Sequence, residues 1–392
     1  QPAKARTYTA ASDTVEVAAL AEGTTGSDAR SFHSLSRART SVAIAGQIGL
    51  EAGYLTDYKS EHLLKIDGFT GPLDVAETRH GPAAALVIGE GTNQIRAGYR
   101  YETGWSGNTH SPMLSATLSI RRTDTLAAIT YRHVRREISV PAEKLPAGSP
   151  IDSRRDSDLV VTAVEQGLPA GWLARIEIGL EVQSGFLQSP FRLVTLWSDR
   201  TAGSAGSDDF GRTLPERHPD HRTRWAVIAR ILKGFESIAG ALEFSAGAGN
   251  GNWRVERHFA DAGWRQRLTD KLMLAVRAGI YHQTRAVFYL NDYTGAAPHG
   301  YWSADPELSS YLAWLAGCDV RIDLYQDRKR LFGLFEHLHL NIGTTVLQRI
   351  FDWRGLDAAE SYTGWERISG GNRVPFEQGL GISSWLIFVG GF

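Results

Sequence analysis

The sequence has little cysteine: Cys318 is the only one among 392 residues. One thiol cannot form an intramolecular disulfide, and it rules out every CxxC motif, including the CxxCH motif that attaches c-type haem. A run of 18 apolar residues is also missing, which excludes a transmembrane helix. These absences exclude a disulfide scaffold, a c-type cytochrome and a helical membrane protein.

Charge of one sign is not in excess, because 42 Lys and Arg face 43 Asp and Glu. A nucleic-acid surface needs a basic excess, so we expect no nucleic-acid partner. No GxSxG nucleophile elbow occurs either, although chance Ser and His pairs are inevitable with 12 His. We therefore expect no catalytic residues, no cofactor and no enzymatic activity. The alternative is a membrane-embedded enzyme, or a metal-binding barrel that uses lumen or loop histidines.

What the chain does contain is a repeated alternation of apolar and charged residues with a period of two. In the segment 94–102, Ile95 and Tyr99 fall on one face, whereas Arg96 and Arg100 fall on the other. Such segments of about ten residues are typical of transmembrane β-strands. A soluble β-sandwich also predicts alternation. Many of these runs are longer than the usual strand of a globular sheet, and their polar faces carry charges of both signs, which favours the barrel.

The polar face of each run is expected to line the barrel lumen. Charges of both signs can tune ion passage, and they can equally close the interior through salt bridges. The predicted lumen-lining residues are Arg96, Arg100, Glu102, Arg121, Arg175, Glu177, Glu181, Arg224, Arg230, Glu243, Arg277, Asp319, Arg321 and Asp323.

Short connections alternate with long ones along the chain, which is the pattern of an up-and-down barrel. Turns are predicted at 90–93, 122–124, 168–171, 233–236 and 268–271, and long links at 60–77, 144–156, 198–221, 291–306 and 352–373. Fifteen strands are predicted near residues 40–54, 83–89, 94–104, 113–121, 126–136, 158–167, 172–184, 190–197, 223–232, 237–248, 253–267, 272–287, 309–325, 333–347 and 377–391. Bacterial barrels prefer even numbers, so we predict an all-β, membrane-spanning, antiparallel up-and-down barrel of 16 strands, with 14 or 18 as alternatives. Residues 1–35 are expected to be a tail or a lumen plug, and residues 36–392 the barrel with long extracellular loops.

The final segment, 383–392, is rich in Trp, Leu, Ile, Phe and Val and ends on Phe392. Such an ending is usual for the closing strand of a bacterial outer-membrane barrel. Phe388 and Phe392 are therefore predicted to be the assembly signal, in a mature chain whose signal peptide has been removed. Tryptophans at strand ends are expected to form the interfacial girdle; they are Trp105, Trp172, Trp197, Trp253, Trp264 and Trp385.

Two groups of histidines are weak candidates for metal binding. His337 and His339 lie two residues apart on a predicted strand, so they point the same way and could chelate a metal. A polar lumen lining is the favoured explanation, because the sequence names no third ligand. His218, Asp220 and His221 cluster in a predicted loop ahead of Arg222. We expect one of two roles for this cluster. It is either a metal or anion site, or a solvated loop that packs its charges against neighbouring carboxylates.

Several pieces of sequence carry a resemblance to a known family. They are Glu77–His80, the run 185–194 (GFLQSPFRLV), the run 218–224 (HPDHRTR), the run 252–255 (NWRV) and the run 281–289 (YHQTRAVFY). The chain resembles a family of outer-membrane barrels catalogued as domain of unknown function 3570, over roughly residues 40–392. The resemblance implies a barrel in the outer membrane and no particular activity.

Together these observations predict a bacterial outer-membrane barrel that acts as a porin-like channel or as a scaffold for a partner complex. Expected partners are outer-membrane lipid and lipopolysaccharide, the barrel-assembly machinery through the C-terminal strand, and a periplasmic protein or lipoprotein.

Overall fold

The structure of the protein is a computed structural model. It describes residues 14–25, 29–45, 47–63, 73–120, 122–139, 152–188, 193–197, 212–290, 293–294, 300–303, 308–331, 335–351 and 379–391. Within these ranges the chain is almost entirely β-structure, with two 3₁₀ turns. No helix in the described part is long and apolar enough to span a bilayer.

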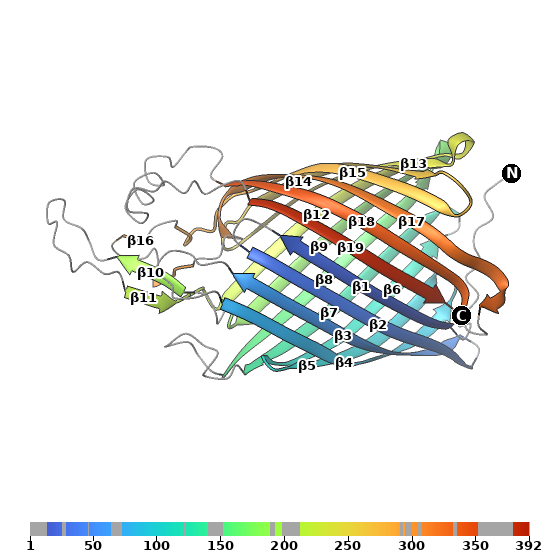
Figure 1. Cartoon of the computed structure of the whole chain (residues 1–392). Helices are drawn as coiled ribbons and strands as arrows, with labels where there is room; N and C mark the ends of the chain where they lie inside the picture. The colour runs from blue at the N-terminus through green and yellow to red at the C-terminus, as the bar shows by residue number, and fades with distance from the viewer. Residues whose placement is uncertain are drawn as a thin grey trace.

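Sixteen of the described strands pair into one closed antiparallel barrel (Figure 1). They are β1 (Thr14–Thr25), β2 (Ala29–Ala45), β3 (Ile48–Leu63), β4 (Leu73–Glu90), β5 (Asn93–Gly104), β6 (Gly107–Ile120), β7 (Thr125–Ser139), β8 (Asp152–Leu168), β9 (Trp172–Gly185), β12 (His221–Phe235), β13 (Gly240–Gly251), β14 (Arg257–Arg267), β15 (Leu272–Gln283), β17 (Tyr311–Leu331), β18 (Phe335–Phe351) and β19 (Gly379–Gly391). Each strand pairs with the barrel strands before and after it in the chain, and β1 pairs with β19 to close the ring. The predicted fold class and the number of 16 strands are confirmed.

The alternation along the strands places apolar side chains on the outside of this ring. On β5, Ile95 is 55% exposed and Tyr99 is 47% exposed, while Arg96 and Arg100 between them are partly buried. Leu114 on β6 and Ile176 on β9 are likewise about half exposed. Large apolar side chains on the outer surface of almost every strand are unfavourable in water and favourable in lipid. The barrel is therefore built to span a membrane.

The N-terminal segment corrects one prediction. Residues 1–35 were expected to be a tail or a plug, but Thr14–Thr25 and the chain from Ala29 onward are strands of the wall. β1 pairs along its length with β2 on one side and β19 on the other. Its Ala-, Gly- and Thr-rich sequence hides the alternation, because small side chains give little contrast between the two faces.

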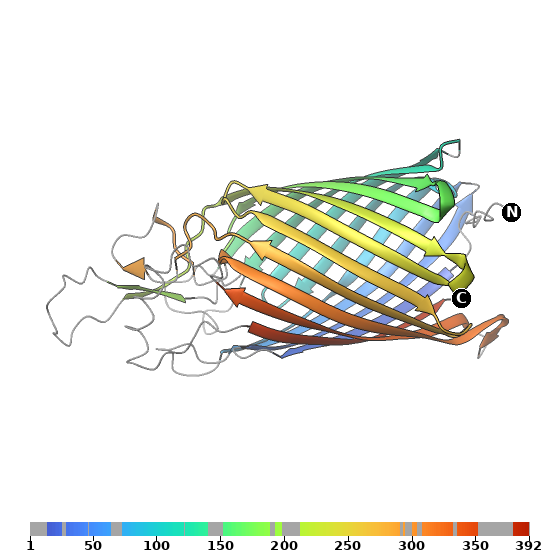
Figure 2. The ribbon, with the colours of Figure 1, turned by 90° about the horizontal axis from the view of Figure 1, so that it is seen from above.

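The two ends of the barrel differ in their connections. One end carries short turns, including η2 (Pro169–Gly171), η3 (Glu236–Ile238) and residues 91–92, and we call it the short-turn end. The other end, the long-loop end, carries the connections 140–151, 186–220, 284–310 and 352–378. β1 begins and β19 ends at the short-turn end (Figures 1 and 2).

A small second sheet lies beyond the long-loop end, separate from the wall (Figure 2). It contains β10 (Leu193–Trp197), β11 (Arg212–Pro215) and β16 (Tyr293–Thr294), in the order β11-β10-β16. The predicted barrel strand at 190–197 is therefore wrong. An apolar run of this length is compatible with either a wall strand or a loop hairpin, and only the pairing partners distinguish them.

The predicted strand at 40–54 is also two strands, since a turn at Gln47 separates β2 from β3. Several other strands are longer than their predicted runs. β8, for example, starts at Asp152, six residues before the predicted start at 158. The extra residues are polar and lie toward the long-loop end, where a strand leaves the hydrocarbon layer and no longer needs an apolar outer face.

Candidate functional site: the charged inner wall

The charged residues of the wall strands share one face, opposite the exposed apolar residues. The strand registers place Glu181 beside Arg224, and Arg175 beside Arg230, so each pair lies on the same side of the sheet. Thirteen of the fourteen predicted lumen-lining residues fall on this inner face: Arg96, Arg100, Glu102, Arg175, Glu177, Glu181, Arg224, Arg230, Glu243, Arg277, Asp319, Arg321 and Asp323. Arg121 lies outside the described residues.

Ion pairs connect many of these side chains across neighbouring strands. Glu243 on β13 accepts contacts from two strands: its Oε1 lies 3.0 Å from Arg230 Nε, and its Oε2 lies 3.3 Å from Arg265 Nη2. Arg96 on β5 pairs with Glu51 on β3. Such pairs hold the inner side chains against the wall, because each charge meets its partner along the sheet surface.

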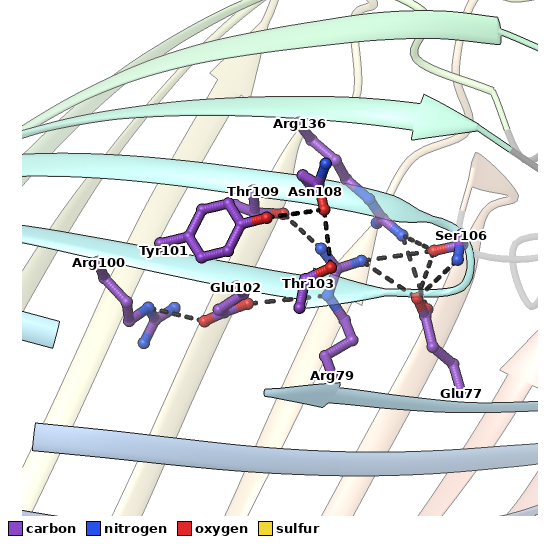
Figure 3. A network of polar contacts seen from close by, with 10 residues as sticks. All are labelled: Glu77, Arg79, Arg100, Tyr101, Glu102, Thr103, Ser106, Asn108, Thr109 and Arg136. Carbon is purple, nitrogen blue, oxygen red and sulfur yellow. Dashed lines mark hydrogen bonds and ion pairs between the residues drawn. The ribbon is translucent and has the colours of Figure 1, made fainter. Parts of the chain in front are cut away.

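The densest polar network lies on β4–β7 near the long-loop end (Figure 3). Arg79 Nε lies 3.8 Å from Glu102 Oε2, its Nη1 lies 3.5 Å from Glu77 Oε1, and its Nη2 donates to Thr109 Oγ1 at 2.5 Å. Arg79 and Glu102 are both less than a tenth exposed. Arg100 Nε approaches the second oxygen of Glu102 at 2.7 Å. These charges are buried only because each has several partners.

Ser106 connects this network to β7. Its hydroxyl donates to Glu77 Oε1 at 2.5 Å, and its backbone N–H donates to the same oxygen at 3.2 Å. Arg136 Nη2 donates to Ser106 Oγ at 3.1 Å and lies 4.0 Å from Glu77 Oε2. The tight turn between β5 and β6 makes this possible, since Gly107 adopts φ +125°, which side-chain-bearing residues rarely adopt.

A second network on β8, β9 and β12 is centred on Glu181. Its Oε1 accepts hydrogen bonds from Ser157 Oγ at 2.8 Å and from Gln183 Nε2 at 2.7 Å. Its Oε2 pairs with Arg224 Nε. The carboxylate is therefore saturated by three donors from its own and two neighbouring strands.

Four inner-face charges in and beside these networks were not predicted from the sequence: Glu77, Arg79, Arg136 and Arg155. Arg155 was placed in the predicted link 144–156, and Glu77 at the end of the link 60–77. A signal was present, because Glu77 and Arg79 lie two residues apart within the piece Glu77–His80, and alternation would have continued the strand through them.

Away from the networks, the inner wall is open to solvent. The side chains of Arg230 and Arg265 are 49% and 57% exposed, although both lie on the inner face. A barrel interior filled with side chains would bury such groups. In the described part of the structure, these guanidinium groups of the inner face are therefore accessible to solvent.

Among the side chains that the structure describes, no third ligand joins the predicted histidine pair. His337 and His339 share one face of β18, and His339 lies opposite Asp323 in the register, but the side chain of His337 is outside the described ones. Within the described ranges, no three His, Cys, Asp or Glu residues are grouped as a metal site would require. Cys318 is free and lies on the outer face, between Trp314 and Val320 in the alternation.

The loop histidines belong to a packed cluster at the long-loop end. His218 is buried, with its ring 5.4 Å from Trp253 and 5.5 Å from Phe288, and its Nε2 lies 3.7 Å from Glu216 Oε2. Ser303 Oγ donates to the other oxygen of Glu216 at 2.8 Å. His221 lies at the start of β12 and Asp220 just before it, and both are exposed.

Four of the pieces that resemble the family meet in and around this loop cluster. Its apolar core consists of Trp253, Val255, Ala286, Phe288, Tyr289 and Leu308, with Leu187 and Tyr301 packed against it. The resemblance therefore follows a folded assembly of loops above the barrel mouth, which sequence alone could not show because the pieces are far apart in the chain.

Trp253 corrects the predicted girdle. It is only 4% exposed, its indole N–H donates to the carbonyl of His221 at 3.0 Å, and Arg222 stacks on its ring at 4.4 Å. It therefore fixes loops together and does not contact lipid. Trp197 is also misassigned, because it lies on β10, outside the wall.

Two other predicted girdle residues lie on the outer face near the short-turn end. Trp172 is 40% exposed with Lys233 Nζ 5.4 Å from its ring, and Trp264 packs against Phe235 at 5.7 Å. Trp105 lies in the tight turn after β5. Toward the other end of the outer face lie aromatic residues that the prediction omitted: Tyr54, Tyr99, Tyr131, Trp225 and Trp314.

The C-terminal strand is described only in its backbone. Trp385 pairs in register with Gly343, and Phe388 pairs with Leu340 and with Ala19. The side chains of Trp385 and Phe388, and all of Phe392, lie outside what the structure describes.

Comparison with known families agrees with this architecture. The model of a family described as "Protein of unknown function (DUF3570)" matches residues 97–336. The chain belongs to this family. The match begins after Glu77–His80 and ends before β19, so it covers the middle of the barrel and the loop cluster. A search of curated proteins by sequence finds no match.

Solved structures with a similar chain path are outer-membrane barrels of very different sequence. One is a bacterial polysaccharide outer membrane secretin, 10% identical, with a TM-score of 0.48, covering 95% of this chain and 97% of that one. Another is OpdK of Pseudomonas aeruginosa with vanillate, 9% identical, with a TM-score of 0.43, covering 97% and 98%. A third is OmpT of Vibrio cholerae lacking loop L8, 6% identical, with a TM-score of 0.45, covering 97% and 99%. Function must therefore be inferred from this chain's own residues.

Proposed function

We propose that this DUF3570 protein is a channel of the bacterial outer membrane that lets small hydrophilic solutes diffuse through its lumen, without catalysis of its own. The observation that carries this proposal is the half-exposed state of inner-wall arginines such as Arg230 and Arg265. A closed, salt-bridged interior would bury these side chains, whereas a water-filled lumen leaves them accessible.

The outer membrane is the compartment that suits the outer surface. Exposed apolar side chains cover the outer face of most strands whose side chains are described. An antiparallel barrel closed through β1 and β19 pairs its backbone groups between neighbouring strands, as a lipid environment requires. Its contact partners are then lipid and, above the apolar zone, lipopolysaccharide. Assembly through the C-terminal strand, and a periplasmic protein or lipoprotein partner, remain part of this proposal.

Conductance tests the channel directly. The full chain is refolded in detergent, checked for the heat-modifiable gel mobility of folded barrels, and added to a planar lipid bilayer in KCl. We expect stepwise increases in current. Replacing Arg230 and Arg265 together with Trp should lower the unit conductance, because bulky side chains would occupy the open part of the inner wall.

The competing function is a scaffold barrel for a partner complex. The packed loop cluster around Trp253 and Phe288 favours it to some degree, because a folded assembly above the mouth could hold another protein. If the folded protein gives no current but co-purifies from its native membrane with a stoichiometric partner, the scaffold function would replace the channel function.

A further inference from the structure

Two arginines face each other across neighbouring strands near the long-loop end. Arg136 on β7 and Arg155 on β8 are directly paired in the register, on the inner face. Side chains in this position have Cβ atoms about 5 Å apart, and like charges placed there repel. A negative charge between the two guanidinium groups would offset this repulsion and so lower its cost in folding free energy.

Glu77 and Glu102 act on Arg136, but no carboxylate in the described residues bonds to Arg155. Arg155 makes no hydrogen bond and no ion pair with any residue in the described part of the chain, and it lies in the electrostatic field of Arg79 and Arg224 as well. Glu181, whose charge acts on Arg155, already accepts bonds from Ser157, Gln183 and Arg224.

Arg136 is only partly satisfied. Its Nη2 reaches Ser106 Oγ, but its Nε is buried and has no hydrogen-bond acceptor in the described structure. Glu77 Oε2 is 4.0 Å from the Nη2, which is too far for a hydrogen bond. A buried guanidinium donor without an acceptor costs roughly as much as a lost charged hydrogen bond, so a ligand that accepts it would be favoured.

On β9, no side chain lies directly opposite Arg155. The residue opposite it on β9 is Gly185, which has φ +93° and no side chain. Arg155 therefore has Arg136 on one flank and bare backbone on the other, with Arg224 one strand further along.

We propose that Arg136 and Arg155, flanked by Arg79 and Arg224, form a binding site for a small oxyanion, such as a phosphate, sulfate or carboxylate group, on the inner wall near the long-loop end. Two guanidinium forks suit an anion with two or more oxygens, because each fork donates a pair of parallel hydrogen bonds. The site deepens the proposed channel function by naming the class of solute that the lumen retains during passage.

Equilibrium dialysis of radiolabelled inorganic phosphate against the full chain in detergent tests the site without relying on conductance. We expect saturable binding by the wild type. Arg155→Gln should weaken it by about tenfold or more, since it removes charged hydrogen bonds. Arg155→Lys should weaken it less, because a lysine keeps the charge but not the fork. The matched control is Arg135→Gln, the same change on the outer face one residue from Arg136, which should leave binding unchanged.

Several results would overturn the site. They are the absence of saturable binding in the wild type, equal binding in the wild type and in folded Arg155→Gln, and equal losses in Arg155→Gln and Arg135→Gln. If Arg155→Gln does not fold, unchanged binding in both Arg136→Gln and Arg155→Lys has the same consequence. Displacement of phosphate by added lipopolysaccharide would assign the arginines to a lipid headgroup instead. Saturable binding combined with no bilayer current would keep the site and remove the channel.

Discussion

At the scale of single residues, the same residue type has opposite roles on the two faces of the wall. Arg79 is buried on the inner face among two carboxylates and two hydroxyls. Arg154 on the outer face of β8 is more than half exposed and pairs with Asp156 at 2.7 Å. A buried ion pair is costly to break because its partner remains charged without solvent, whereas an exposed pair is screened by water.

Arg79→Leu should therefore lower the free energy of unfolding by about 3–5 kcal/mol, because Glu77 and Glu102 lose their shared partner. Arg154→Leu, the control, should cost about 0–1 kcal/mol. Urea unfolding followed by tryptophan fluorescence in lipid vesicles gives both values. Equal costs for the two variants would contradict the structural role of the buried network.

At the scale of elements, the seam between β1 and β19 decides whether the barrel is closed. Leu20 of β1 pairs with Ile387 of β19 and with Leu35 of β2, so its backbone lies within a continuous ladder. The small sheet at the long-loop end does not belong to this ladder, although β10 is an apolar strand by sequence.

Leu20→Pro should prevent closure, since proline cannot donate a ladder hydrogen bond and is tolerated only at sheet edges. We expect loss of the heat-modifiable, protease-resistant form. Thr195→Pro in β10 makes the same change outside the wall and should leave that form intact. A Leu20→Pro protein with normal heat modifiability would show that the barrel closes without β1.

Element lengths were the part of the fold that sequence predicted least well. The runs 126–136 and 158–167 stop short of Ser139 and start after Asp152, because the alternation was followed only where one face is apolar. Beyond the membrane both faces of a strand are polar, so the alternation ends. The strand itself continues because it still pairs with its neighbour, and no local pattern reveals that pairing. Arg155, which faces Arg136, lies in one of these extensions.

At the scale of the whole molecule, the asymmetry of the two ends predicts an orientation. Barrels of this kind place short turns in the periplasm and longer loops outside the cell. Asn252 lies in the connection before β14 at the long-loop end, and Asp270 lies in the turn at 268–271 at the short-turn end, and both are exposed.

In a Cys318→Ser background, Asn252→Cys should react with a membrane-impermeant maleimide on intact cells. Asp270→Cys should react only after the outer membrane is permeabilised. The comparison of labelled bands before and after permeabilisation reports the orientation. The reverse pattern would place the loop cluster in the periplasm.

The sequence by itself determined the class of fold, the even number of strands and thirteen of the inner-face charges, because a period of two along a strand decides which side chain faces lipid and which faces the lumen. Only the tertiary structure decided that β1 closes the ring, that Trp253 is buried among the loops, and that Arg136 lies opposite Arg155. Each of these depends on which strand or loop lies beside another. Contacts between segments tens to hundreds of residues apart produce no periodic pattern in the sequence.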